Sequence, residues 1–293
     1  MNPISKIATA LCFVAKHPVN RNRKFRAVAE YGFIQVAARL VPGDVCVEFP
    51  NRTRLMVSPH MKGAAHFIAP RLCEFDDMSF VMHFLRPGEL FADVGAFTVL
   101  AAGVAGARTI SFEPSAETFE MLSRNVRLNN LTNRARPVNA VVGKSVGSVQ
   151  FSSGLGTENH VAAASEKENS VTVPMTTLDS ELAAQPATLL KVDVEGFETE
   201  VFGGAENTLK NQALQAIIVE RNGSGNRYGY DEAALHAQIR QHGFQPCSYA
   251  PFARQLRPLN EANEGNIIYI RDRAAAEERL RSANAFTLDD LKV

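Results

Sequence analysis

The segment LLKVDVEGFE, residues 189–198, constrains the fold more than any other part of this chain. It is an apolar run that ends at Gly196 and continues into a helical segment. This pattern is typical of a buried parallel strand followed by a crossover helix. Ligands of open α/β sheets bind beyond the carboxyl ends of such strands. We therefore expect Asp193 and Glu195 to lie beside a ligand.

From residue 89 onward, predicted strands alternate with predicted helices, which favours a mostly parallel sheet with helices on both faces. The last two strands leave too little chain between them for a crossover helix, so we expect an antiparallel hairpin at the edge of the sheet. The predicted strands are residues 90–96, 107–112, 138–142, 150–152, 170–174, 189–194, 216–220, 245–249 and 266–270, and the predicted helices are residues 98–105, 116–129, 198–209 and 231–242.

Residues 1 to 42 are predicted to be helical and basic, with apolar side chains at helical spacing from Phe25 to Ala37. One interpretation is an amphipathic helix on an anionic membrane surface or on a partner. The other is a helix that packs against the protein and exposes a basic face. We favour the packed helix, because charged helix faces are usually solvated, and we do not expect peripheral membrane contact.

The segment before the alternating pattern is predicted to form a small appendage. Pro42-Gly43 ends the basic helical region, residues 44–49 and 54–58 alternate like the strands of a hairpin, and residues 74–85 read as a helix. The predicted organisation is an N-terminal appendage over 1–72, a main domain over 73–272 and a C-terminal surface helix and tail over 273–293.

Composition excludes several classes of protein. The 293 residues carry a formal net charge of zero, which gives no reason to expect nucleic-acid binding. The four cysteines are scattered, so neither a disulfide framework nor a zinc site is expected, and a reducing compartment fits. The apolar run at residues 7–15 is too short to span a bilayer and precedes a basic stretch. We expect a cytoplasmic protein with no transmembrane segment, and the sequence leaves its oligomeric state open.

Three predicted strand ends carry glycine or carboxylates: Asp93 and Gly95 in FADVGA, Glu113 in SFEP, and Asp193 with Glu195. A glycine turn after the first strand and an acid after the second are how Rossmann-like folds hold a nucleoside, since the acid accepts hydrogen bonds from ribose hydroxyls. The three strand ends together favour a nucleoside-type cofactor.

Dinucleotide and phosphate binding are less favoured, because no G-x-G-x-x-G follows the first strand and no G-x-x-x-x-G-K-[ST] occurs. A nicotinamide oxidoreductase is therefore the weakest of the enzyme hypotheses. An acidic site suits a cofactor that carries positive charge, and S-adenosylmethionine, with its sulfonium and ammonium groups, fits that description.

Several motifs together resemble the FkbM-type methyltransferases. They are FADVGA, SFEPS with NVRLNN, LLKVDVEGFETEVFGGAENTL, IIVERN and GNIIYIRD, and the resemblance covers about residues 70–272. It implies a Rossmann-like class I methyltransferase fold, S-adenosylmethionine as the methyl donor and methylation of a hydroxyl oxygen. The acceptor is expected to be a saccharide or a secondary metabolite.

The resemblance also implies roles for particular residues. By it, Asp93 and Gly95 lie beside the methionine part of the cofactor, and Glu113 holds the ribose. Asp193 and Glu195 lie near the transferred methyl group.

The chain departs from the family in the first turn. The family pattern is D-V-G-A-N-x-G-x-x-T, whereas here Ala96 runs directly into Phe97 and the helix that follows, so the Asn and the second Gly have no counterpart. We expect a shortened turn, with Phe97 near the pocket. Two outcomes stay open: the shorter turn still binds the cofactor, or the protein has lost turnover and serves as a binding or scaffold module.

Methyl transfer from a sulfonium needs an aligned oxygen nucleophile and a group that removes its proton. Asp193 is the first candidate for this base and His160, in the polar segment GTENHV, is the second. Glu220 is expected either to line the acceptor pocket or to cap its strand. Lys191 and Glu198 are predicted to pair at the strand–helix junction.

A metal ion is not expected. Asp193, Glu195 and Glu220 offer oxygen ligands that a divalent cation accepts, but no spacing in the sequence requires one.

Overall fold

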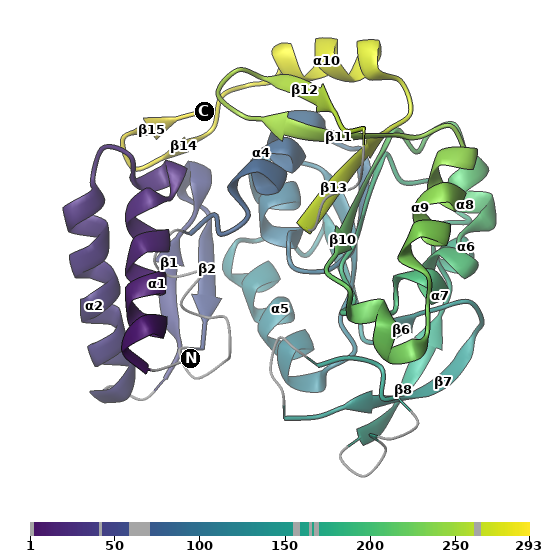
Figure 1. The fold of residues 1–293 in the computed structure, drawn as a ribbon, viewed down its shortest axis with the longest axis horizontal. Helices are drawn as coiled ribbons and strands as arrows, with labels where there is room; N and C mark the ends of the chain where they lie inside the picture. Colours follow the sequence, from purple (N-terminus) through teal and green to yellow (C-terminus); the bar gives the residue numbers. More distant parts are fainter. Residues whose placement is uncertain are drawn as a thin grey trace.

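The computed structural model describes residues 3–40, 43–58, 71–154, 159–163, 166, 170–260 and 265–293. An eight-stranded sheet forms the centre of the main domain (Figure 1). Its strand order is β12-β11-β13-β10-β9-β3-β4-β5. The strands are β3 (Leu90–Val94), β4 (Arg108–Phe112), β5 (Ala135–Val138), β9 (Leu189–Val192), β10 (Ala216–Arg221), β11 (Gln245–Ala250), β12 (Gln255–Pro258) and β13 (Gly265–Ile270).

The five strands from β5 to β10 run parallel, and β13 lies between β10 and β11 and is antiparallel to both. This confirms the predicted mostly parallel, Rossmann-like sheet with antiparallel pairing toward one edge. The hairpin at that edge differs from the predicted one. It pairs β11 with β12, a strand that the sequence did not predict, because β13 inserts beside β10 instead of staying at the edge.

The predicted strand 138–142 is wrong as a single element. β5 ends at Val138, and β6 (Val141–Val142) joins a separate three-stranded sheet with β8 (Ser170–Thr176) and β7 (Gly147–Ser152). The Asn139 side chain causes the change of direction, because its amide donates to the carbonyl oxygens of Glu113 and Pro114 at 2.8 and 3.1 Å. The chain therefore leaves the large sheet directly after β5.

Helices cover both faces of the sheet (Figure 1). Alternate strand residues bury on opposite sides, so Phe91 contacts one apolar core and Ala92 the other. One face carries α4 (Phe75–Phe84), η3 (Leu100–Val104), α5 (Ala116–Leu128) and α10 (Arg273–Arg281), and the other carries α6 (Leu178–Glu181), α7 (Glu198–Gly203), α8 (Glu206–Lys210) and α9 (Glu232–Gln241). The predicted helix 198–209 is thus two short helices, α7 and α8.

The N-terminal region contains α1 (Pro3–Lys16), η1 (Pro18–Asn20), α2 (Lys24–Leu40), β1 (Val45–Glu48), η2 (Pro50–Arg52) and β2 (Arg54–Val57). The predicted helices and hairpin are therefore confirmed, while Pro42 lies outside the described residues. Asn125 of α5 holds the hairpin, since its side chain accepts from the Met56 amide at 2.6 Å and donates to the Met56 carbonyl at 3.0 Å.

The predicted packing of the N-terminal apolar face is wrong. α1 and α2 bury Val14 and Ala27 against each other, but Phe25, Phe33 and Val36 of α2 are 94%, 74% and 56% exposed. The periodicity identified a helix, but of the apolar side chains that it aligned, Phe25, Phe33 and Val36 face solvent, while Val28 packs against α1.

The C-terminal tail is more than the predicted surface helix. After α10, the strands β14 (Thr287–Leu288) and β15 (Leu291–Lys292) pair, and Phe286 and Leu288 enter the core beneath α4. Asp289 at their turn accepts from Arg23 at 2.5 Å and from Arg71 at 2.9 Å. The two ends of the chain are therefore connected by charged contacts.

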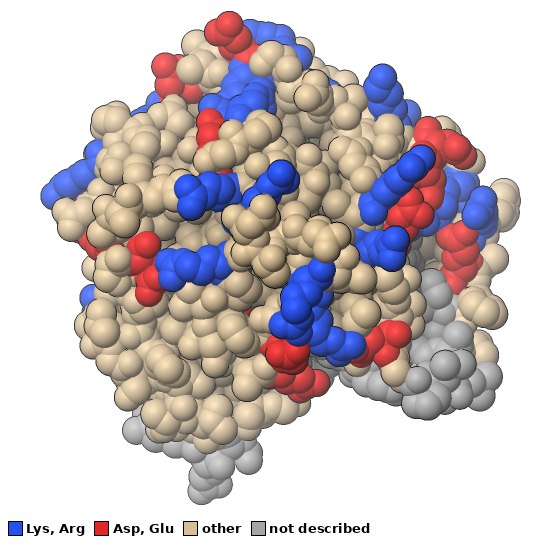
Figure 2. Space-filling view, turned by 180° about the vertical axis from the view of Figure 1, so that it is seen from behind, with Lys and Arg blue, Asp and Glu red and all other residues tan. Residues whose placement is uncertain are grey.

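Charged side chains of both signs share the surface. On the face that Figure 2 shows, Lys and Arg lie interspersed with Asp and Glu and are separated by uncharged residues. Among the described residues, no helix combines the length and hydrophobicity that crossing a bilayer requires.

Candidate active site

A cavity of about 510 Å³ lies at the carboxyl ends of β3, β4, β9 and β10. Its volume is within the range of about 300–1,000 Å³ that small-molecule sites occupy. Of the residues that the sequence analysis selected for the site, six line it: Gly95, Phe97, Glu113, Asp193, Glu195 and Glu220. Asp93 and His160 do not.

The cavity wall is rich in carboxyl groups. Five carboxylates and one ammonium group line the cavity: Glu74, Glu113, Asp193, Glu195, Glu220 and Lys191. Apolar side chains supply other parts of the wall, among them Val141, Phe151 and Phe197. A cavity of this kind favours a ligand that combines positive charge with an apolar, planar surface.

Glu113 follows β4, as the sequence predicted, and one of its oxygens holds the next turn. Its Oε1 accepts from the Ser115 amide at 2.8 Å, and Ser115 in turn caps α5 through the Thr118 amide. Burial raises the pKa of Glu113 to about 7, and the charge of Asp93 adds to the effect. The second oxygen accepts no hydrogen bond from a described residue, so it can receive a ligand hydroxyl.

Asp93 is buried, does not line the cavity and organises the short turn. Its Oδ2 accepts from the Phe97 amide at 2.9 Å and from the Thr98 hydroxyl at 2.7 Å, which ties the end of the turn and the start of the next helix back to β3. The side chain is fully buried, and burial raises its pKa to about 6. In this structure Asp93 therefore acts on the turn, without facing the cavity directly.

Phe97 leaves the cavity open. Its side chain is 1% exposed and belongs to the core on the α4 side of the sheet, although its edge contributes to the cavity wall. At Gly95 a Cβ would lie 3.2 Å from Lys191 Nζ, so any side chain there would require the lysine to move by a few tenths of an ångström. The short turn therefore coexists with a cavity large enough for a small-molecule ligand.

Lys191 is a buried ammonium group inside the central strand β9. Its Nζ donates to Asp193 Oδ2 at 2.6 Å and lies 4.6 Å from the centroid of the Phe97 ring. Burial alone favours the neutral amine, but the charges of Asp193, Glu74 and Asp93 outweigh it and raise the pKa of Lys191. Lys191 therefore stays charged beside the cavity.

The predicted pairing of Lys191 with Glu198 is wrong. Glu198 Oε1 instead accepts from the backbone amides of Val194 and Gly196, at 3.1 and 3.2 Å. The cause is the turn after β9, which bends these two amides back toward α7, so the nearest acceptor for Lys191 is Asp193.

The turn after β9 has an unusual backbone. Glu195 has φ 55° and Gly196 has φ 104°, so two consecutive residues lie at positive φ. A Cβ at Gly196 would lie 2.5 Å from the carbonyl carbon of Ser224, which restricts this position to glycine. Strain at a non-glycine residue such as Glu195 is characteristic of functional sites.

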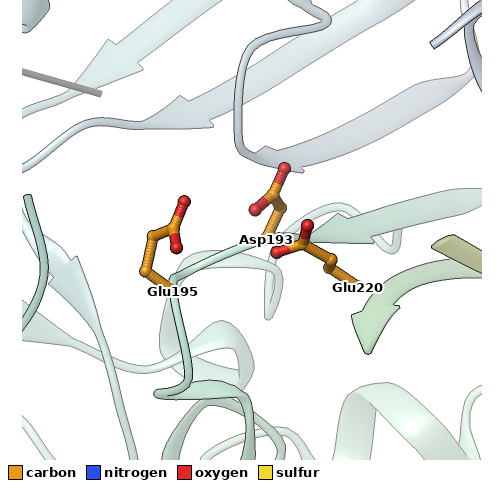
Figure 3. A group of neighbouring side chains, drawn as sticks. All are labelled: Asp193, Glu195 and Glu220. Carbon is orange, nitrogen blue, oxygen red and sulfur yellow. The ribbon is translucent and has the colours of Figure 1, made fainter. Parts of the chain in front are cut away.

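This turn brings three carboxylates together, as Figure 3 shows. Oxygen atoms of Asp193, Glu195 and Glu220 lie within 4.8 Å of one another. Burial raises the pKa of Glu220 to about 8, and the negative charges of Asp193 and Glu195 add to the effect. The group can share a proton, and its oxygens are also ligands that a divalent cation accepts. The absence of a metal ion stays a prediction.

His160 is buried next to the cavity wall without lining it. Its Nε2 lies 3.2 Å from Glu166 Oε2, and its backbone amide donates to the Ser152 hydroxyl at 2.9 Å. The neighbouring residues Asn159 and Val161 line the cavity. The described part of the polar segment therefore reaches the site through the residues on either side of His160.

Three further charged residues line the cavity: Glu220, Lys191 and Glu74. Glu220 agrees with one of its two predicted roles, whereas the sequence did not predict that Lys191 and Glu74 line the cavity. Glu220 follows the same strand-end rule as Asp193, so that rule alone identifies it. A lysine within an otherwise apolar strand was the signal for Lys191. Glu74 comes from the start of α4, and no local pattern connects it to the strand ends.

Comparisons with known proteins now give the family. The model of the methyltransferase FkbM domain matches residues 89–246, which is more than half of the chain. The chain therefore belongs to the FkbM methyltransferase family. Together with the sheet described above, this makes the main domain a class I methyltransferase fold, and the methyl donor of the class is S-adenosylmethionine.

Solved structures with a similar fold are distant in sequence. An FkbM methyltransferase from Methylobacillus flagellatus superposes with a TM-score of 0.43 and 14% identity over 83% of this chain and 59% of that one. An rRNA methylase from Streptococcus thermophilus gives 0.37 and 14% over 66% and 91%. A TehB-like methyltransferase from Corynebacterium glutamicum gives 0.39 and 10% over 67% and 88%.

These likenesses are too remote to transfer an activity. The chain spans 59% of the length of the FkbM structure, and no protein with a curated description matches it. The acceptor must therefore be argued from the site itself.

Proposed function

We propose that this protein is an S-adenosylmethionine-dependent O-methyltransferase that acts on a hydroxyl of a saccharide or a secondary metabolite. The observation that supports the proposal is the acidic cavity of about 510 Å³ at the strand ends. Its electrostatics suit a ligand with a sulfonium and an ammonium group. When bound, that cofactor supplies an electrophilic methyl group.

The residues present fit the cofactor in charge and in hydrogen bonding. Glu113 has one carboxylate oxygen open for ribose hydroxyls, and Gly95 allows close approach of the backbone. Lys191 makes a single hydrogen bond among the described residues and lines the cavity, so its remaining N–H groups can bind the carboxylate of the methionine part. Asp93 supports this arrangement by holding the turn.

When bound, the cofactor would supply its methyl group to the acceptor oxygen, and the electrons of the carbon–sulfur bond would leave with sulfur. The hydroxyl proton of the acceptor would then pass to a base of this chain. We assign the base to the Asp193–Glu220 pair. Asp193 remains its first member because it lies beside the charged Lys191 and faces the cavity, whereas His160 does not line it.

Calorimetric titration of the full chain with S-adenosylmethionine tests the proposal. We expect saturable binding that Glu113→Gln weakens by about ten- to a hundredfold, since a hydrogen bond to a charged group contributes about 1.5–3 kcal/mol. Glu120→Gln is the matched control, because Glu120 lies on the exposed side of α5. Absence of a binding heat at millimolar S-adenosylmethionine would contradict the enzyme proposal.

The three-residue turn after β3 supports a second candidate, a methyltransferase-fold binding module without turnover. The two candidates differ in one measurement. Transfer of labelled methyl groups to a panel of hydroxyl-bearing acceptors is expected for the enzyme, whereas the binding module would bind the cofactor and transfer none.

A further inference from the structure

The outer face of α2 is an apolar surface with no described partner. Phe25, Ala29, Phe33 and Val36 are spaced so that they form one stripe along the helix, and all four are exposed. Ala27, on the opposite side of α2, packs against Val14 of α1. The stripe therefore points away from the protein.

Exposed large apolar residues concentrate in this part of the molecule. Seven such residues occur among the described ones, and four of them, Phe13, Phe25, Phe33 and Val36, belong to α1 and α2. Single exposed apolar residues are ordinary, but a continuous group marks an interaction surface. We call the exposed stripe of Phe25, Ala29, Phe33 and Val36 the α2 face.

The α2 face lies in the most basic part of the chain. Residues 1–40 contain seven Lys and Arg and one acidic residue, Glu30, which gives a formal charge of +6. The remaining residues contain 24 basic and 30 acidic residues, a formal charge of −6. A protein with no net charge therefore carries a basic helical pair on an acidic body.

Some of these basic groups are engaged within the protein and others are not. Arg23 pairs with Glu30 and with Asp289, both at 2.5 Å. Lys16 and Lys24 are exposed, and neither forms an ion pair with a described acidic residue. Lys24 directly precedes Phe25, so positive charge borders the apolar stripe.

We propose that the α2 face docks this protein on an anionic lipid surface. Interfacial helices combine an apolar stripe with aromatic residues and flanking Lys or Arg, and each basic group adds attraction to acidic headgroups. A second copy of the chain fits less well, because a two-fold symmetric contact through α2 would bring two regions of formal charge +6 together.

The helix α1, which packs against α2, also reaches the active site. Phe13 of α1 lines the cavity. The docking surface and the cavity wall are therefore parts of one packed unit. The proposal does not depend on methyl transfer and can be tested without the acceptor.

Vesicle co-sedimentation of the full chain tests the proposal. We expect binding to vesicles of phosphatidylcholine and phosphatidylglycerol, weaker binding to phosphatidylcholine alone, and loss of binding as salt rises. Phe25→Ser with Phe33→Ser is expected to lower partitioning by about tenfold or more, since two large apolar side chains no longer enter the interface. Val146→Ser with Val171→Ser is the matched control, because both valines are exposed on the main domain.

Charge-reversal variants test how much electrostatic attraction contributes to vesicle binding, separately from the apolar side chains. Lys16→Glu with Lys24→Glu is expected to weaken binding to the anionic vesicles, again by about tenfold or more. Arg108→Glu with Arg134→Glu changes two exposed arginines of the main domain and is expected to leave binding unchanged. Thermal unfolding of each variant checks that the fold is retained.

Absence of binding to the anionic vesicles, or equal binding of the parent chain and the double Phe variant, would overturn the proposal. So would equal binding to neutral and anionic vesicles. A dimer in sedimentation velocity that the double Phe variant dissociates, without vesicle binding, would assign the α2 face to a second copy instead.

Discussion

The cavity at the strand ends and the α2 face use the same kinds of side chain in opposite ways. At the cavity, Phe97 is 1% exposed and the carboxylates are held close together in a shielded space. On α2, Phe25 is 94% exposed and the neighbouring Lys24 faces solvent. Burial raises the pKa of Glu74, Glu113 and Glu220 at the cavity, whereas exposure leaves Lys16 and Lys24 of the N-terminal helices available to a partner. The surroundings of a side chain, more than its type, determine what it does.

The largest expected effect tests the cavity side of this comparison. Asp193→Asn is expected to lower the rate of methyl transfer by about 10²–10⁴-fold, because it removes the proposed proton acceptor and the partner of Lys191. The rate is measured with an acceptor found in the labelled-methyl panel. Asp290→Asn, on the exposed turn of the tail, is the control. Full activity of the Asp193 variant would move the base to Glu220 or His160.

A pair of identical substitutions compares the two regions directly. Phe97→Ala is expected to lower the free energy of unfolding by about 3–5 kcal/mol, because it leaves a cavity in a packed core. Phe33→Ala should change it by less than about 0.5 kcal/mol, since the side chain is 74% exposed. Urea unfolding measures both. Equal losses would mean that α2 packs against something in solution, and the contrast between the regions would fail.

A smaller effect concerns pH. The raised pKa of Glu113, about 7, means that its neutral form predominates below that pH. A cationic cofactor favours the ionised form, so binding releases a proton and affinity should rise about tenfold from pH 6 to pH 8. Calorimetry in buffers of different ionisation enthalpy measures both the number of protons released and the affinity at each pH. Glu113→Gln should flatten the profile, and an unchanged slope would assign the proton to another group.

The same raised pKa acts on stability with the opposite sign in the free protein. The folded state binds more protons than the unfolded chain between pH 4.5, the ordinary pKa of this acid, and about pH 7. Its contribution to stability is therefore present below pH 4.5 and is lost as pH rises through 7. Unfolding experiments without cofactor should show this trend, and saturating cofactor should remove it, because the bound and the unfolded states both carry the ionised carboxylate.

The smallest expected effect is that of metal removal. We expect EDTA to leave cofactor binding unchanged, because Lys191 already neutralises Asp193 and a raised pKa of about 8 keeps Glu220 largely protonated near neutrality. A loss of binding that magnesium restores would show instead that Asp193, Glu195 and Glu220 hold a cation.

Much of the fold could be predicted from local patterns. The run at 189–194 gave β9 to within two residues, since apolar runs bounded by glycine are a strong strand signal. The prediction of one strand over 138–142 was wrong. The Asn139 side-chain amide bonds to the chain after β4, and the residues that follow join another sheet. The sequence did not predict β12, because its short, polar sequence lacks the apolar alternation that indicates a strand. Pairing with β11 stabilises it in the structure.

The candidate site was predictable where one rule applied. Parallel strands end at one edge of the sheet, and this placed Gly95, Glu113, Asp193 and Glu195 around one cavity. The rule could not show that the Asp93 side chain contacts the turn instead of lining the cavity. It predicts only that residues near the carboxyl end of a strand lie near the cavity, and it does not say which way each side chain points. It also could not bring in Glu74, which reaches the cavity from a helix on one face of the sheet.

The sequence by itself determined the family, the strand–helix alternation and the acids at the strand ends, because these depend on periodicity and on motifs that are local along the chain. Only the tertiary structure decided that Lys191 pairs with Asp193, that Phe97 turns into the core and that the apolar stripe of α2 faces outward. Those outcomes depend on which distant segments come into contact, and contact sets burial, charge state and exposure. The residues next to a given position in the sequence do not show which distant segments will contact it.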